Sequence, residues 1–468
     1  MPVSEQPRPE QPRPAATTQP AYTPVRWNED YGYLKDPAKR TDPFDPIKYI
    51  PLNEQGDWYL SLGGQARSRY ELFDNFNFGA GPQDGNGFHL LRLLGHADAH
   101  FGPNLRTFMQ VKSAFADGRD LDPRPIIDED DFDIEQAFAD VKIPFDGGGS
   151  VTLRGGRQNL LYGAQRLISP LDWTNTRRTF DGGKASIAFP KNNTLDLFYV
   201  HPVLVDEKEL NSFNDNVAFA GAYDVLLLPD LIQDARSKLE LYALYLDNRA
   251  ALFAQGMGQE ERYTLGARFW TNPNSWDLDL EAAYQFGEFG DGGDISAWMV
   301  AFEAGYTFAD ATFSPRLYLG FDVASGDDDP GDEDLGTFNQ LFPLGHAYFG
   351  YIDVVGRQNI VDLHPGLELT LLQNRNKVKK LALRADYHLF WRYSDDDALY
   401  NAAGTVLRPA GGSDEHFVGS EIDLLLNWQI DRHLAAYIGY SHLFAGDFID
   451  ETGAATGFDE DIDFFYVA

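Results

Sequence analysis

The sequence predicts an all-β fold, a transmembrane antiparallel β-barrel of about 18 strands. Apolar and polar residues alternate with a period of two over long stretches. No apolar run reaches the ~18 residues that a membrane-spanning helix needs. The connections between the predicted strands are short turns and long acidic loops, an arrangement that is typical of outer-membrane barrels.

Residues 57–73 form the first predicted strand. Its even positions, from Trp58 to Leu72, are apolar or small, whereas its odd positions include Arg67, Arg69 and Glu71. Successive side chains of a strand point to opposite faces, so this pattern indicates one face in lipid and one in water. Globular strands usually have about five or six residues, whereas a spanning strand needs about nine to eleven. The length of this stretch therefore favours a membrane strand.

The same alternation continues to the C-terminus. The clearest further strands are residues 87–101, 105–115, 134–143, 262–269, 276–286, 315–323, 381–391 and 420–428. Weaker candidates are residues 151–158, 180–189, 194–201, 216–226, 238–246, 295–308, 361–372, 433–444 and 461–468. Together they give about 18 strands. The last one is shorter than a spanning strand, although closing a barrel requires it to pair with the first.

Two regions divide the chain. Residues 1–56 are expected to be a Pro-rich disordered tail and lead-in, and residues 57–468 the outer-membrane barrel. The N-terminus has no basic stretch followed by an apolar one, so no signal peptide is visible. If the protein is exported, we expect the chain to be a mature or a re-annotated form of it.

Composition narrows the classes of function. The formal net charge is -34, which argues against a nucleic-acid partner. Acidic residues gather in predicted loops, at 128–133, 327–334, 395–397 and 459–463. They suit solvated loops, or loops that bind divalent cations alone or together with anionic lipid headgroups. The absence of Cys excludes disulfides, a thiol nucleophile and Cys-ligated zinc. No cofactor is expected.

Three groups of motifs carry a resemblance to a known family. They are residues 156–160 followed by 172–176, residues 386–392 followed by 395–397, and residues 419–424. In this order and spacing they resemble the alginate-export family of outer-membrane porins. The resemblance implies an ~18-stranded barrel in the outer membrane of a bacterium. It also implies contact with outer-membrane lipid and lipopolysaccharide, and it allows a periplasmic export partner.

The best-known member of that family passes an anionic uronate polymer through an arginine-lined lumen. Here the alternation places a row of cations on the polar face, and guanidinium groups suit carboxylates because their donors match two oxygens. We therefore expect a channel for a hydrophilic, anionic solute or an alginate-like polysaccharide. The expected substrate-binding, pore-lining residues are Arg67, Arg69, Arg92, Arg106, Lys112, Arg154, Arg157, Arg268, Arg316, Arg384 and Arg392. Arg157 breaks the alternation beside Gly155, where a bulge could redirect it.

Other interpretations of these polar faces stay open. The cations could pair with lumen carboxylates such as Asp98 and Asp140 to hold the wall together. His96, Asp98 and His100 could bind a metal, but a water-facing row explains them equally well, and no metal is expected. Asp279 and Glu281 have the residue types of a glycosidase, but no catalytic motif accompanies them, so an enzyme is not expected. The alternatives are a barrel enzyme acting on lipid or glycan, and a structural barrel with a closed lumen.

Overall fold

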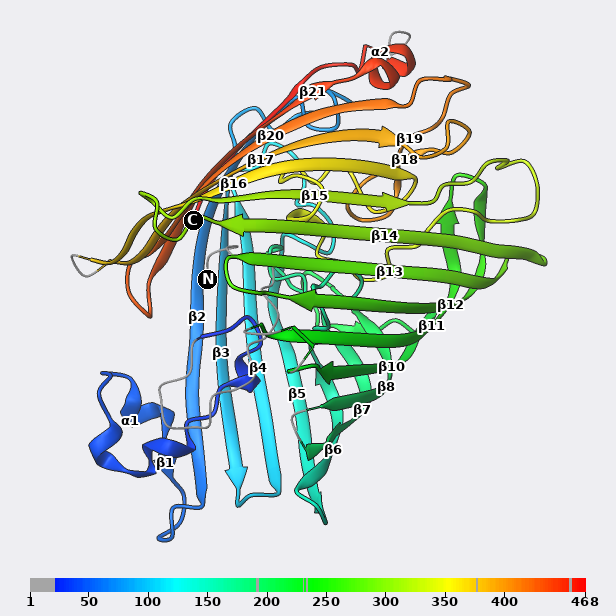
Figure 1. The fold of residues 1–468 in the computed structure, drawn as a ribbon. Coiled ribbons are helices and arrows are strands. Elements are labelled where there is room, and N and C mark those ends of the chain that lie inside the picture. Colours follow the sequence, from blue (N-terminus) through cyan, green and yellow to red (C-terminus); the bar gives the residue numbers. More distant parts are fainter. Residues whose placement is uncertain (1–21, 191–192, 230, 233–234, 376–377, 454–456) are drawn as a thin grey trace.

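The structure is a closed antiparallel β-barrel (Figure 1). It is a computed structural model that describes residues 22–190, 193–229, 231–232, 235–375, 378–453 and 457–468. Of the 20 strands in the main sheet, β1 and β9 have two residues each, and the other 18 form the barrel. The predicted fold class is confirmed.

Each barrel strand pairs with its neighbours in the chain, and β22 also pairs with β2. The barrel strands are β2 (Trp58–Asp74), β3 (Phe88–Phe101), β4 (Leu105–Asp117), β5 (Asp130–Phe145), β6 (Gly149–Gln158), β7 (Phe180–Ala188), β8 (Thr194–Leu204), β10 (Val217–Leu227), β11 (Ser237–Phe253), β12 (Gly256–Thr271), β13 (Trp276–Phe289), β14 (Gly293–Thr307), β15 (Arg316–Ala324), β16 (Ile360–Arg375), β17 (Val378–Arg392), β20 (Phe417–Gln429), β21 (Ala435–Ala445) and β22 (Ile462–Val467). The short β22 closes the barrel by pairing with residues 70–74 of β2.

The remaining elements are small and lie at the two ends of the barrel or, in the case of η5, inside it. They are η1 (Arg26–Asn28), η2 (Gly32–Lys35), η3 (Pro37–Lys39), α1 (Asp45–Lys48), β1 (Ile50–Pro51), β9 (Ser212–Phe213), η5 (Gly345–Ala347), β18 (Leu399–Tyr400), β19 (Val406–Arg408) and α2 (Asp447–Gly453). Figure 1 shows α1 and β1 beside the start of β2, and α2 at the opposite end of the barrel. Among the described helices, none has the length and hydropathy needed to cross a membrane.

The alternation of side chains separates a lumen face from an outer face. On β12, the Arg262 and Arg268 side chains are fully buried inside the barrel, whereas Tyr263 and Leu265 on the outer face are 43% and 53% exposed. A polar inner face and an apolar outer face are what a lipid-embedded barrel requires.

Two long connections fold into the lumen. The first inward loop, residues 159–179, joins β6 to β7, and the second inward loop, residues 325–359, joins β15 to β16. They meet at a short bridge between Ile168 and Phe342. Buried apolar side chains of both loops, such as Leu167 and Phe338, share one hydrophobic core with wall residues such as Phe180. The barrel is therefore filled by its own loops at this level.

The lead-in occupies the end of the barrel where the turns are short. Tyr31, Leu34 and Tyr49 pack with Tyr59 of β2 in a small apolar cluster. Trp27 lies deeper, where its backbone carbonyl accepts a hydrogen bond of 2.6 Å from Arg106. The predicted disorder of residues 1 to about 25 falls almost entirely outside the described residues.

Aromatic side chains inside the barrel pack across glycines of the neighbouring strand. Tyr242 of β11 lies opposite Gly266 of β12, and Tyr466 of β22 lies opposite Gly439 of β21. A Cβ at either glycine would overlap the tyrosine ring. Glycine at these positions therefore lets a large ring lie flat against the wall.

We expect Gly266→Ala to reduce the free energy of unfolding by about 1–3 kcal/mol, because the added methyl displaces the Tyr242 ring in a packed interior. Urea unfolding in detergent micelles measures this change. Gly155→Ala is the matched control, since a Cβ there would meet nothing within 4 Å. Equal effects of the two substitutions would contradict the packing argument.

Lys48 of α1 makes docking of the lead-in dependent on pH. Burial lowers the pKa of Lys48 to about 8, with Glu29 and Asp42 opposing the shift and Arg26 and Arg432 adding to it. The docked pKa lies below that of the free side chain, so the undocked state holds an extra proton between the two values. Docking is therefore weakest below pH 8 and strengthens as the pH rises above it.

A fluorophore at the exposed position Ala38, introduced as a single cysteine, measures this docking by its anisotropy. We expect the docked fraction to rise between pH 8 and about 10.5, and Lys48→Met to remove most of that rise. A rise that Lys48→Met leaves unchanged would assign the titration to groups other than Lys48.

Candidate functional site

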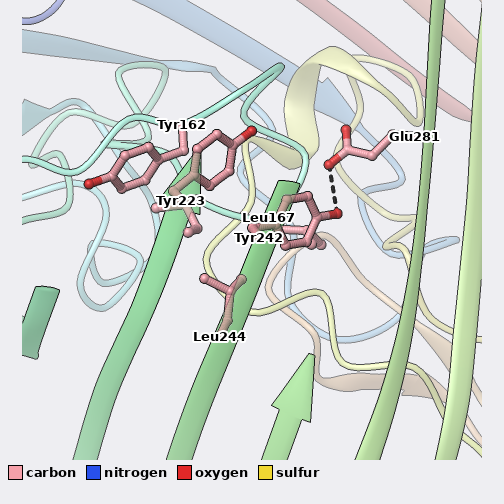
Figure 2. A pocket seen from close by; sticks show the side chains of 7 residues that line it. Tyr162, Leu167, Tyr223, Tyr242, Leu244 and Glu281 are labelled. Atoms are coloured by element: carbon pink, nitrogen blue, oxygen red, sulfur yellow. Dashed lines mark hydrogen bonds between the residues drawn. The ribbon is translucent and has the colours of Figure 1, made fainter. Parts of the chain in front are cut away.

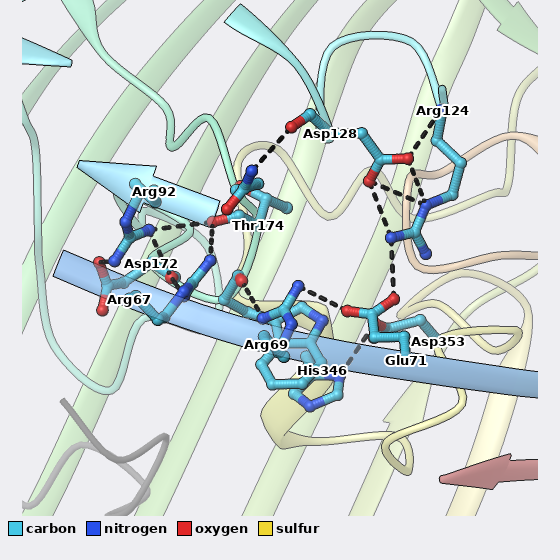
Figure 3. Close-up of polar contacts among 12 residues, drawn as sticks. Arg67, Arg69, Glu71, Arg92, Arg124, Asp128, Asp172, Thr174, His346 and Asp353 are labelled. Carbon is cyan, nitrogen blue, oxygen red and sulfur yellow. Dashed lines mark hydrogen bonds and ion pairs between the residues drawn. The ribbon is translucent and has the colours of Figure 1, made fainter. Parts of the chain in front are cut away.

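Four of the predicted lumen cations hold the first inward loop by its backbone, and Figure 3 shows three of them, Arg67, Arg69 and Arg92. Arg67 of β2 donates to the carbonyl oxygens of Asp172 and Thr174, at 2.7 and 2.8 Å. Arg92 of β3 donates to the same two carbonyls, each at 3.0 Å. These guanidinium groups therefore bind neutral acceptors on residues 172–174.

Arg69 and Lys112 extend this arrangement along the loop. Arg69 donates to the Trp173 carbonyl at 2.6 Å, and its guanidinium lies 3.8 Å from the centre of the Trp173 ring. Lys112 of β4 donates to the Thr176 carbonyl at 2.7 Å. Each also has a carboxylate partner, Glu71 for Arg69 and Asp130 for Lys112.

Side chains of the loop complete the attachment. Asp172 pairs with Arg92 at 2.9 Å and with Arg177 at 3.0 Å. Burial raises the pKa of Asp172, but the attraction of Arg92, Arg177 and Arg67 outweighs it and holds the pKa well below its usual range. Asn175 donates to the backbone carbonyls of three separate segments. The loop is therefore fixed to β2–β5 by both charge and hydrogen bonds.

Five other predicted cations are in ion pairs with carboxylates of the wall. The pairs are Arg106 with Asp98, Arg154 with Asp140, Arg268 with Glu240 and Asp279, Arg316 with Asp277 and Glu303, and Arg384 with Asp386. Several are bidentate, as when Arg154 meets both oxygens of Asp140 at 2.7 and 2.8 Å. This geometry is that of the wall-stabilising alternative.

The remaining two predicted residues differ from these sets. Arg392 donates to the carbonyls of Asp395, Asp397, Ser413 and Glu415 at the loop end of β17. β6 pairs with β5 and β7 without a register shift near Arg157, so the expected bulge is absent. Arg157 therefore faces the opposite way from Arg154, away from the lumen, and pairs with Asp181 and Asp133.

The second inward loop stacks against the first. The ring centres of His346 and Trp173 are 3.6 Å apart and the rings are nearly parallel, and the Asp353 carboxylate lies 2.9 Å from His346 Nδ1. Arg178 of the first loop donates to the Pro343 carbonyl at 3.1 Å. The two loops therefore form one body across the lumen.

A cavity of ≈ 10 Å³, room for about one water molecule, lies between the first inward loop and the wall (Figure 2). Its lining residues are Tyr162, Leu167, Ile168, Tyr223, Tyr242, Leu244 and Glu281. Inside it, the Tyr242 hydroxyl donates to Glu281 at 2.9 Å.

The residues of the two alternative sites, His96, Asp98 and His100 for a metal and Asp279 and Glu281 for a glycosidase, are engaged in other contacts. Asp98 binds Arg106 and lies 3.2 Å from His100, whereas the ring of His96 stacks on Phe108. Among the described residues, His96, Asp98 and His100 do not form a group that could hold a metal ion. Asp279 and Glu281 both accept from Arg166, at 2.9 Å each, as part of an ion-pair network.

Sequence reasoning missed the cations of the inward loops. Arg166, Arg177 and Arg357 are buried in the lumen and Arg178 is half-buried there, each by contacts with distant strands or loops. The loops have no strand periodicity that could orient these side chains. The one available signal was the resemblance motif at residues 172–176, whose carbonyls meet the lumen cations.

Comparison with known proteins gives one family and many structures of the same fold. The sequence profile of the family described as "Alginate export" matches residues 58–460. A search of curated proteins finds no match. The Pseudomonas aeruginosa protein OpdK, solved with vanillate, is 10% identical, with a TM-score of 0.55 over 90% of this chain and 98% of its own.

Two further Pseudomonas aeruginosa structures are similar in the same way. OccK5 (OpdH) is 11% identical, with a TM-score of 0.53 over 88% of this chain and 96% of its own. OccK2 (OpdF), in complex with glucuronate, is 14% identical, with a TM-score of 0.53 over 90% and 97%. The closed barrel thus has an outer-membrane porin fold, its place is the bacterial outer membrane, and the chain belongs to the alginate export family.

Proposed function

We propose that this protein is an outer-membrane channel for a hydrophilic solute or polysaccharide that bears carboxylates. In this proposal the inward loops occupy the path of the solute, and the structure is the closed form. The passage opens when these loops leave the centre of the lumen.

The observation that carries the proposal is the set of partners of Arg67. Its guanidinium donates to two loop carbonyls, and no ion pair of the described residues gives it a carboxylate. Hydrogen bonds from a cation to a carboxylate are roughly twice as strong as those between neutral groups. A solute carboxylate can therefore replace the Asp172 and Thr174 carbonyls at Arg67 as the loop withdraws.

The same reasoning separates the predicted cations into two groups. Arg67, Arg69, Arg92, Lys112 and Arg392 donate to loop carbonyls, which a moving solute can replace. Of these, Arg69, Arg92 and Lys112 also pair with the carboxylates of Glu71, Asp172 and Asp130, whereas Arg67 and Arg392 have no ion pair among the described residues. Arg106, Arg154, Arg268, Arg316 and Arg384 are already neutralised by wall carboxylates, so we assign them to the wall. A series of weak sites of the first kind would let an anion move from one to the next.

The ligands of two structural relatives support the chemical class. OpdK was solved with vanillate and OccK2 in complex with glucuronate, and both ligands carry a carboxylate. Glucuronate is a uronate, the kind of unit that makes up an alginate-like polymer. We extend that class to this chain, as free uronates or as a uronate polymer.

Opening of the loops can be tested with a disulfide, because the chain has no native Cys. Ile168 and Phe342 lie side by side in the bridge between the loops, within the range that a disulfide can span. We expect Ile168→Cys/Phe342→Cys to conduct ions in planar bilayers when reduced and to stop conducting when oxidised.

The single variant Ile168→Cys is the control, and oxidation should leave its conductance unchanged. Conductance that persists in the oxidised double variant would show that these loops do not gate the lumen. If neither the native protein nor the reduced variant conducts, the alternative of a structural barrel with a closed lumen is supported instead.

The role of Arg67 can be tested by the block of ionic current with uronate oligomers. We expect Arg67→Gln to weaken the block about tenfold, which corresponds to about 1.4 kcal/mol of binding free energy, and to reduce anion selectivity measured by reversal potential. The control is Arg249→Gln, which changes an exposed arginine on β11. Equal block in the native protein and Arg67→Gln would remove Arg67 from the solute path.

A further inference from the structure

A second polar cluster lies on the lumen wall formed by β15–β20. Asp362 and His364 are on β16, and His388 is on the adjacent strand β17. All three side chains are buried. Among the described residues they are the one group of three His, Cys, Asp or Glu side chains placed to hold a metal ion, with one ligand atom from each within 4.8 Å of the others.

Both histidines direct the same ring nitrogen at one carboxylate. His364 Nδ1 lies 2.7 Å from Asp362 Oδ2, and His388 Nδ1 lies 3.0 Å from the same oxygen. The two rings have centres 4.8 Å apart. Ligands of one tetrahedral metal ion are separated by about 3–3.5 Å, so small side-chain rotations bring all three atoms around one ion.

The wall is shaped to hold this cluster. Gly320 of β15 lies opposite His364, and a Cβ at Gly320 would overlap the imidazole ring. The His364 ring therefore occupies the space that a side chain would fill if position 320 were any residue other than glycine. His388 is held on its other side by stacking on Phe390, with ring centres 5.4 Å apart.

The charges around the cluster are incompletely balanced. Asp362, Glu421 and Asp423 are buried carboxylates, and the ion pairs of the described residues give none of them an Arg or Lys partner. Asp423 Oδ2 is buried, has no hydrogen-bond partner, and lies 3.8 Å from His388 Nε2. Buried negative charge of this kind is costly unless a cation or a proton neutralises it.

We propose that Asp362, His364 and His388 bind a divalent transition-metal ion, with Zn²⁺ as the best match to two imidazoles and one carboxylate. The metal takes Nδ1 of both rings, so the remaining proton of His388 lies on Nε2. That N–H then points toward Asp423 Oδ2, the oxygen that otherwise has no donor. Metal-bound histidines commonly donate their second ring N–H to a carboxylate in this way.

Such a metal would also support the second inward loop. The backbone N–H of Ile352 donates to Glu421 at 3.1 Å, and that of Tyr351 donates to Asp423 at 3.4 Å. The ion fixes His388, which faces Asp423, and so steadies the wall to which residues 351 and 352 attach. This role is independent of the solute that passes the lumen.

Metal content of the full-length, tag-free protein tests the proposal. The protein is refolded with Zn²⁺ or Co²⁺ and freed of loose metal on a chelating resin, and its metal is then measured by mass spectrometry. We expect about one ion per chain, a visible Co²⁺ spectrum of nitrogen and oxygen ligation, and a Zn²⁺-dependent rise in unfolding temperature. His364→Gln and His388→Gln should lose the ion.

His442→Gln is the matched control, because His442 also contacts two carboxylates, Asp463 and Asp461, but belongs to no three-residue group. It should retain the ion. Wild-type protein that holds no Zn²⁺ or Co²⁺ would overturn the proposal, whatever the folding of the variants. Metal that remains in folded His364→Gln or His388→Gln would assign binding to another place, such as the acidic loops.

Discussion

The structure depends on hydrogen bonding between backbone groups, because the lipid around the barrel offers these groups no partners. In lipid, each strand N–H and C=O must find a partner in a neighbouring strand, so the sheet has to close. The short β22 achieves this by pairing with both β21 and β2. Closure sends every second side chain inward. The polar inner face is thus a consequence of the fold, and its charges need partners inside the barrel.

The first inward loop and the lumen cations provide partners for each other. The carbonyls of a loop inside a barrel have no neighbouring strand whose N–H groups could donate to them. Here the missing donors are supplied by Arg67, Arg69, Arg92 and Lys112. Those cations would in turn be buried with too few acceptors if the loop left. Removal of the loop from the lumen therefore requires a replacement acceptor, which links gating to the arrival of an anion.

The sequence predicted what depends on local periodicity. A period of two located β2, β12 and β13, and it placed Arg67 and Arg268 on the inner face. It failed at Arg157, where a bulge was expected beside Gly155 but the register is regular. The inward loops lay beyond its reach, because Arg67 meets Asp172 across 105 positions of the chain and no period orients a loop side chain. The sequence therefore left open whether the lumen is open or closed.

The interior has two charged regions of opposite character. On β2–β4 the cations are satisfied in part by neutral carbonyls. On β16, β17 and β20 the carboxylates Asp362, Glu421 and Asp423 meet histidines, the Ser441 hydroxyl and backbone N–H groups, and the ion pairs of the described residues give them no Arg or Lys. The charges of one region do not neutralise those of the other, because the charged side chains of each region pair with groups close to them. As proposed, an exchangeable anion binds in the first region when the loops withdraw, and a fixed cation binds in the second. The two ligands would differ in lifetime, because carbonyls are replaced easily whereas a metal held by three side chains is not.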